Sequence, residues 1–141
     1  MVSIHFEDTE TLDLDPGFFG LWLGDICLSE NRVLGAVALV MCSDEYLLKL
    51  NKDHLNHDYY TDIITFDYCE GLMVGGDLFI SIDRVRENAG ALDELFHVEL
   101  RRVVAHGVLH LIGFQDKTED ESFTMRAKEN EALALFVSRE T

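Results

Sequence analysis

The pattern of apolar and polar residues predicts β-strands in the first half of the chain and long helices at its end. Runs rich in aliphatic, β-branched and aromatic residues predict the strands. These runs are Val2–Phe6, Val33–Cys42, Ile63–Phe66 and Asp77–Ile82. The second run is the most apolar and is short for a helix, so it predicts a buried strand. The glycines between the last two runs, Gly71, Gly75 and Gly76, predict a turn that brings both strands into one sheet.

Helix start signals divide the rest of the first half. Asp15 followed by Pro16 is typical of a helix N-terminus, and the apolar pattern extends this helix to about Leu28. Its apolar face should dock on the sheet. Ser43 predicts the cap of a second helix, and the polar stretch Asn51–Asp62 predicts a loop.

Two further helices are predicted before the last one. Asp83–Ala89 predicts a short helix that Gly90 stops, and Asp93 predicts the cap of the next helix. That second helix keeps an apolar face until Gly113. A glycine can take a positive φ there, which ends the helix and turns the chain back.

The end of the chain completes the predicted fold. Thr118 and Glu121 form a capping-box pair, which predicts a last helix that extends to about Val137. Strands followed by long helices predict an α+β fold, with helices packed against a mixed sheet. At 141 residues the chain should form a single domain over residues 1–141, with a hydrophobic core of its own.

Net charge narrows the functional classes. The formal net charge is −16, from 27 acidic and 11 basic side chains, so the average surface should repel nucleic acid. Acids on exposed helix faces, such as residues 119–131, would give solubility. The alternative is a docking surface for a basic partner.

The remaining composition predicts a soluble cytoplasmic protein. The N-terminal stretch MVSIHFEDTE lacks the order of a signal peptide, and the longest apolar run is about half a membrane span. Cys27, Cys42 and Cys69 form no metal-binding or redox pair, so they predict reduced thiols.

The stretch HGVLHLIGFQD, residues 106–116, carries the strongest chemical signal. His106 and His110 lie four residues apart, so on a helix both rings can face one point. Beyond the stop at Gly113, Asp116 could return to that point. Two imidazoles and one carboxylate are three ligands, and a catalytic zinc site has three protein ligands plus an open position. The alternative is a buried helix that carries histidines by chance, but burying unsatisfied rings among apolar neighbours is costly.

The spacing of this stretch is also similar to that of the metzincin proteases, whose last ligand is usually histidine. Those proteases have a glutamate directly after the first histidine, where it acts as a general base. Gly107 occupies that place and cannot move a proton. A peptidase of this kind is therefore not expected.

The same stretch resembles the HGxLHLxGYDH signature of the YbeY family, metal-dependent endoribonucleases implicated in ribosomal RNA maturation. Two upstream segments extend the resemblance. Residues 50–66 are similar to the family's LNxxYRxxDxPTDVLSF, and GGDLFIS, residues 75–81, is similar to its LGDIxIS. Three motifs in the family's order are a specific signal.

The resemblance implies a zincin-like α+β fold, a metal usually taken as zinc, and ligands at His106 and His110. The family's third histidine ligand falls on Asp116, which keeps a metal-binding atom but changes its charge. The family's arginine, thought to assist catalysis, falls on Leu55. His57 could supply a replacement charge, or it could be an ordinary solvated loop histidine.

We therefore expect a hydrolase, an endoribonuclease in ribosome biogenesis. One metal ion held by His106, His110 and Asp116 would activate water for attack on an RNA phosphodiester. Zinc is the expected ion, and iron, nickel or manganese would also fit these ligands. No catalytic side chain is assigned beyond the ligands.

Ribosomal RNA is the expected partner, whereas DNA and membranes are not. Four arginines precede the histidines and could contact phosphate or pair with neighbouring acids. They are Arg84, Arg86, Arg101 and Arg102. Affinity could also come from a basic ribosomal protein or the small ribosomal subunit. Two other functions stay open: a metallohydrolase of a smaller ester or amide, and a non-catalytic ribosome-associated factor with a structural metal.

Overall fold

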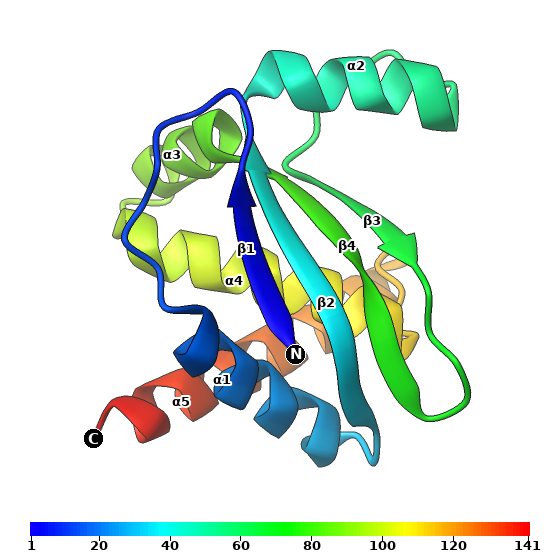
Figure 1. Cartoon of the computed structure of the whole chain (residues 1–141), viewed down its shortest axis with the longest axis vertical. Coiled ribbons are helices and arrows are strands. Elements are labelled where there is room, and N and C mark those ends of the chain that lie inside the picture. Colours follow the sequence, from blue (N-terminus) through cyan, green and yellow to red (C-terminus); the bar gives the residue numbers. More distant parts are fainter.

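The computed structural model describes residues 1–141 and mixes helices and strands in the predicted α+β arrangement (Figure 1). Along the chain the elements are β1 (Val2–Phe6), α1 (Pro16–Ser29), β2 (Val33–Cys42), α2 (Asp44–Leu55), β3 (Ile63–Asp67), β4 (Met73–Ser81), α3 (Ile82–Ala91), α4 (Phe96–Ile112) and α5 (Glu119–Glu140). Every run predicted as a strand or helix is present. The differences from the prediction concern where elements begin and end.

The four strands form one mixed sheet in the order β1-β2-β4-β3. β1, β2 and β4 are parallel, and β3 pairs with β4 in the antiparallel direction at one edge. The register places Ile63 opposite Ile80 and Thr65 opposite Leu78. α4 packs against β3 and β4. The helix that carries both histidines therefore lies under this edge of the sheet.

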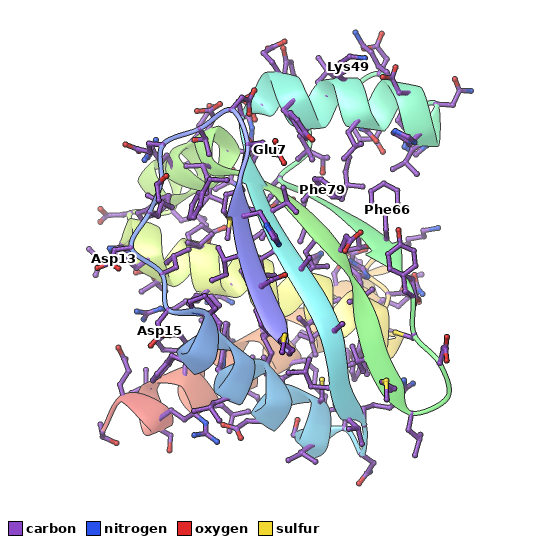
Figure 2. The ribbon with its side chains drawn as sticks, in the orientation of Figure 1. Glu7, Asp13, Asp15, Lys49, Phe66 and Phe79 are labelled. Atoms are coloured by element: carbon purple, nitrogen blue, oxygen red, sulfur yellow. The ribbon has the colours of Figure 1, made fainter.

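The two faces of the sheet are covered differently. Leu78 and Ile80 of β4 belong to the main core, which also receives side chains from α1, α3, α4 and α5. Phe79 points to the opposite face, since successive strand residues alternate. There its ring packs edge-on against Phe66, with centroids 5.7 Å apart. Figure 2 shows both residues on the side of the sheet that faces α2. α2 contributes Leu47 to this smaller cluster.

The main core joins the first helix to the last. Trp22 of α1 is fully buried, and its indole N–H donates a hydrogen bond to the backbone oxygen of Ala132 in α5 at 2.8 Å. The ring of Phe136 packs edge-on against Trp22 at 4.9 Å. These contacts fix α5 across the core.

None of the five helices combines the length and the apolar character that a membrane-spanning segment needs.

The predicted loop over Asn51–Asp62 begins later than expected, because α2 continues to Leu55. Asn51 is only 1% exposed and lies one turn after the buried Leu47. Tertiary packing therefore extends the helix through polar residues. Asn56, in the left-handed conformation, then ends it.

β4 begins at Met73, earlier than predicted, so Gly75 and Gly76 lie within the strand and not in the turn. A Cβ at Gly76 would lie 2.4 Å from the backbone oxygen of Phe66 and 3.1 Å from Leu111. The glycine is needed for close packing inside the sheet, which a strand glycine can also indicate.

Four other details were predicted wrongly. β2 is buried only from Val37 onward, and Ile82 begins α3 where it was expected to end a strand. α3 continues through Gly90, because one helical glycine costs only about 1 kcal/mol, which packing offsets. Asp93 does not cap α4. It takes a φ of 54°, which aspartate tolerates, and the N-cap is Leu95.

Gly107 lets α4 lie close to the sheet. A Cβ at this position would lie 2.6 Å from Ile63 Cδ1 and 3.1 Å from Leu78 Cδ1. An added Cβ here would force the Ile63 side chain, or the helix itself, to shift. The glycine next to His106 therefore sets the position of the histidine ring at this edge of the sheet.

Gly107→Ala should destabilise the protein by about 1–3 kcal/mol, since the overlap with Ile63 outweighs the better helix propensity of alanine. Gly24→Ala is a matched control in the middle of α1, where an added Cβ would meet no atom within 4 Å. It should stabilise by about 0.5–1 kcal/mol. Urea denaturation of the parent and both variants measures the difference. Equal stability of the two variants would show that close packing at Gly107 is not a constraint.

Candidate metal centre

The C-terminal half of α4 holds two histidine rings together. The Nε2 atoms of His106 and His110 are 2.9 Å apart. Each Nδ1 atom faces an oxygen: a carboxylate oxygen of Glu129 at 2.7 Å from His106, and the backbone oxygen of Phe114 at 2.8 Å from His110. A carboxylate and a carbonyl oxygen only accept hydrogen bonds, so both Nδ1 atoms must donate. In neutral rings the two Nε2 atoms then carry the free lone pairs.

Two lone pairs that face each other at 2.9 Å repel unless a positive charge stabilises them. A proton on one ring would remove the repulsion. A metal cation bound by both nitrogens would do so as well, and it would use both lone pairs. The orientation of the rings therefore calls for a positive charge at this point.

The chain turns back sharply after α4. Gly113 ends the helix with a φ of 125°, and the N–H of Phe114 donates to the backbone oxygen of Leu109 at 3.0 Å. The Arg32 guanidinium donates to the backbone oxygen of Ile112 at 2.8 Å. These hydrogen bonds satisfy carbonyls that the end of a helix leaves free. The turn directs the following residues toward the histidines.

Asp116 follows this turn and reaches both rings. Its Oδ2 atom lies 3.2 Å from His106 Nε2 and 3.5 Å from His110 Nε2. The Ser122 hydroxyl donates to the backbone oxygen of Asp116 at 3.0 Å, so the first turn of α5 helps to hold it. The structure thus brings together the three side chains that the sequence predicted as ligands.

The three donor atoms fit a small tetrahedral cation. Atoms bonded to zinc at about 2.0–2.2 Å in a tetrahedron lie roughly 3.3–3.6 Å from one another. The separation of 3.5 Å lies in that range, and those of 3.2 and 2.9 Å lie slightly below it, so a small shift of the side chains would seat the ion. The group that could hold a metal consists of these three residues, with no fourth His, Cys, Asp or Glu. A bound ion would keep one position open.

Glu129 was predicted to lie on an exposed face of α5, and this is wrong. The residue is 5% exposed, and its carboxylate also lies 3.3 Å from the Arg102 guanidinium. The sequence held one signal for it. Glu129 is in phase with the buried Met125 and Ala132 along α5, and an acid on the apolar face of a helix needs a buried partner. That partner is His106.

Charges around the site shift the pKa of His106. Burial lowers this pKa, but the hydrogen bond and charge of Glu129, with the charges of Asp116 and Asp62, outweigh burial and raise it. Burial raises the pKa of Glu129, while its hydrogen bond and attraction to His106 bring it below its ordinary value. Burial also raises the pKa of Asp62. Below the pKa of His106, a metal must displace a proton to bind.

An open cavity of about 480 Å³ lies beside the three donors. Another part of its wall is formed by Leu55 at the end of α2 and by His57 and Tyr59 in the loop that follows. No lysine or arginine lines it. His57 therefore lies within the site, and its Nδ1 atom is 3.0 Å from the Tyr59 hydroxyl.

The four arginines considered as phosphate contacts are all paired with acids. Their pairing was one of the two alternatives that the sequence left open. Contact with phosphate would require these ion pairs to open. The pairs are Arg84 with Asp44, Arg86 with Glu10, Arg101 with Glu140 and Arg102 with Glu129.

Comparisons with known proteins give a consistent result. A family model described as Endoribonuclease YbeY matches residues 24–137. A Porphyromonas gingivalis protein named Endoribonuclease YbeY is 50% identical over 116 residues, which cover 82% of this chain and 77% of the relative. A protein of the same name from Phocaeicola vulgatus is 44% identical over 135 residues, or 96% of this chain and 98% of the relative.

A solved structure is similar as well. The solution structure of a Thermotoga maritima protein matches with a TM-score of 0.69 at 27% sequence identity, and covers 99% of this chain and 91% of that one. The matches extend far beyond the three motifs that first carried the resemblance.

Glu129→Gln should lower the pKa of His106, because the amide keeps an acceptor beside Nδ1 but removes the negative charge. NMR titration of the histidine rings in metal-free protein measures this change. Glu131→Gln removes an acid of α5 that pairs with Lys128, and it should leave the pKa of His106 where it is in the parent. An unchanged or higher pKa of His106 in Glu129→Gln would contradict the role of this carboxylate.

Proposed function

The chain belongs to the endoribonuclease YbeY family, and from this membership we propose that it cuts ribosomal RNA during its maturation in the cytoplasm, using a metal ion held by His106, His110 and Asp116. Members of this family are hydrolytic nucleases. The observation that carries the proposal is that three donor atoms lie close to one another in the wall of an open cavity. An open fourth side favours a catalytic metal, because structural sites close that position with a protein ligand.

Each residue of the site has its own task in this proposal. The metal ion, when bound, activates water and offsets the charge of an RNA phosphate. His106 and His110 bind through Nε2, while Glu129 and the backbone oxygen of Phe114 keep the rings oriented. Asp116 adds the third bond and a negative charge. The site is therefore about one unit less positive than a site of three histidines.

Zinc is the metal that we propose for this site. Two imidazoles and one carboxylate with an open position are a known zinc ligand set. The same set is used by iron(II) oxygenases, and nickel or manganese could also occupy it. The three donor separations support a small tetrahedral ion.

The acidic surface bears on how RNA is bound. The net charge is −16, and the cavity has no lysine or arginine in its wall. Free RNA should therefore bind weakly, since phosphate contacts supply most non-specific affinity. We propose that a basic ribosomal protein or the small ribosomal subunit adds affinity by contacting the acidic helix faces.

His110→Ala should abolish both zinc binding and RNA cleavage, because it removes one of three donors. Elemental analysis and cleavage of a ribosomal RNA transcript are measured on the same preparations. His97→Ala is the matched control, since His97 lies exposed near the start of the same helix, and it should keep both properties.

Cleavage at the parent's rate by metal-free His110→Ala protein would refute the proposal. Hydrolysis of a small ester by the parent, without cleavage of RNA, would instead support a metallohydrolase of smaller substrates. Bound zinc in the parent without any hydrolysis would support a structural metal.

Asp116→His should move the rising limb of the pH–rate profile of RNA cleavage to lower pH. The substitution makes the site about one unit more positive, so water there loses a proton more easily. Asp120→His changes the total charge equally but lies exposed in α5 outside the cavity, and its profile should match the parent's. A limb that stays in place or moves to higher pH in Asp116→His would count against the assigned role of this aspartate.

A further inference from the structure

Two aromatic rings of the loop after α2 lie in the wall of the cavity that contains the three donors. The rings of His57 and Tyr59 are stacked, with centroids 5.2 Å apart and an angle of 22° between their planes. Both residues line the cavity. Tyr59 is nevertheless 55% exposed, so much of its ring makes no contact within the protein.

Asn51 fixes the backbone that carries these two rings. It is a buried residue of α2, and its backbone oxygen accepts a hydrogen bond from the N–H of His57 at 3.1 Å. Its side-chain amide donates to the backbone oxygen of Tyr59 at 2.9 Å. Asn56 turns the chain in the left-handed conformation just before the pair. The backbone of the pair is thus held in position before any ligand binds, which lowers the entropy lost on binding.

The wall of the cavity offers aromatic surface and no fixed positive charge from lysine or arginine. Stacking of bases on aromatic side chains is a general way to hold unpaired RNA, and it accepts any base because every base has a π-face. A cavity of about 480 Å³ also lies within the range of sites that bind small ligands. Its chemistry therefore suits a nucleobase better than an additional phosphate.

We propose that the His57–Tyr59 pair binds one unpaired base of the RNA, next to the phosphate at His106, His110 and Asp116. The proposal rests on the endoribonuclease function above and names the contact by which this chain holds its substrate. Tyr59 supplies the exposed face, and His57 supports that ring from its other side. Binding of this base depends on ring area, so salt should weaken it less than it weakens phosphate contacts.

Single-turnover cleavage of a short fluorescein-labelled RNA is measured at increasing concentrations of zinc-loaded protein. It gives the half-saturating protein concentration and the maximal rate as two separate quantities. Tyr59→Leu keeps an apolar side chain but removes the ring, and it should raise the half-saturating concentration about tenfold. Tyr59→Phe keeps the ring and should stay near the parent. Tyr68→Leu removes a tyrosine that is 62% exposed and lies outside this cavity, so it should have no effect.

A second measurement tests the stacking without relying on cleavage. An RNA with 2-aminopurine beside the cleaved bond, on one side or the other, should lose fluorescence when it binds the parent or Tyr59→Phe. The loss should be much smaller with Tyr59→Leu. An RNA that lacks this base should bind the parent and Tyr59→Leu equally, because the Tyr59 ring contributes to binding only by stacking on that base.

The outcomes separate this proposal from the proposed function. If the parent cuts RNA with zinc but Tyr59→Leu has the parent's half-saturating concentration, the base site is wrong and the nuclease function stands. The base site is also wrong if the defect of Tyr59→Leu persists in two RNAs, one that lacks the base on one side of the cleaved bond and one that lacks the base on the other side. If the zinc-loaded parent does not cut RNA, the proposed function itself fails.

Discussion

The site depends on two hydrogen bonds that hold the histidine rings from behind. Glu129 and the backbone oxygen of Phe114 occupy the Nδ1 atoms, so the Nε2 lone pairs of His106 and His110 must face each other. One acceptor comes from α5 and the other from the turn that ends α4. The need for a positive charge at this point follows from the way the last two helices are joined. Asp116 reaches the same point because it belongs to that joining segment.

The sequence predicted the order of the elements and the three donors because their signals are local. Histidines four residues apart share a helix face, and a glycine after the helix allows the chain to return. Glu129 could not be predicted in the same way. It lies 23 residues from its partner, and its burial depends on how α5 crosses α4. The phase of Glu129 with the apolar residues of α5 indicates burial without naming a partner.

The wrong boundaries have a common physical cause. Gly76 and Gly90 predicted a turn and a helix end, but the first lies in a strand where only glycine fits and the second lies inside a helix. Asn51 predicted a loop, but it is buried within α2, where it bonds to the segment that follows the helix. In each case tertiary contacts outweigh a local preference of about 1 kcal/mol. Gly107 has two separate consequences. Its lack of a side chain excludes the general base of a metzincin protease, and it also lets α4 lie close to Ile63.

The central claim is that one cation joins two imidazoles and one carboxylate. A crystal structure of zinc-loaded protein, with anomalous scattering measured at the zinc edge, tests it most directly. We expect one ion bonded to Nε2 of His106, Nε2 of His110 and a carboxylate oxygen of Asp116, each at about 2.0–2.2 Å, with its remaining position open to the cavity. An ion bonded through Nδ1, a fourth protein ligand, or an Asp116 side chain turned away from the ion would contradict the account.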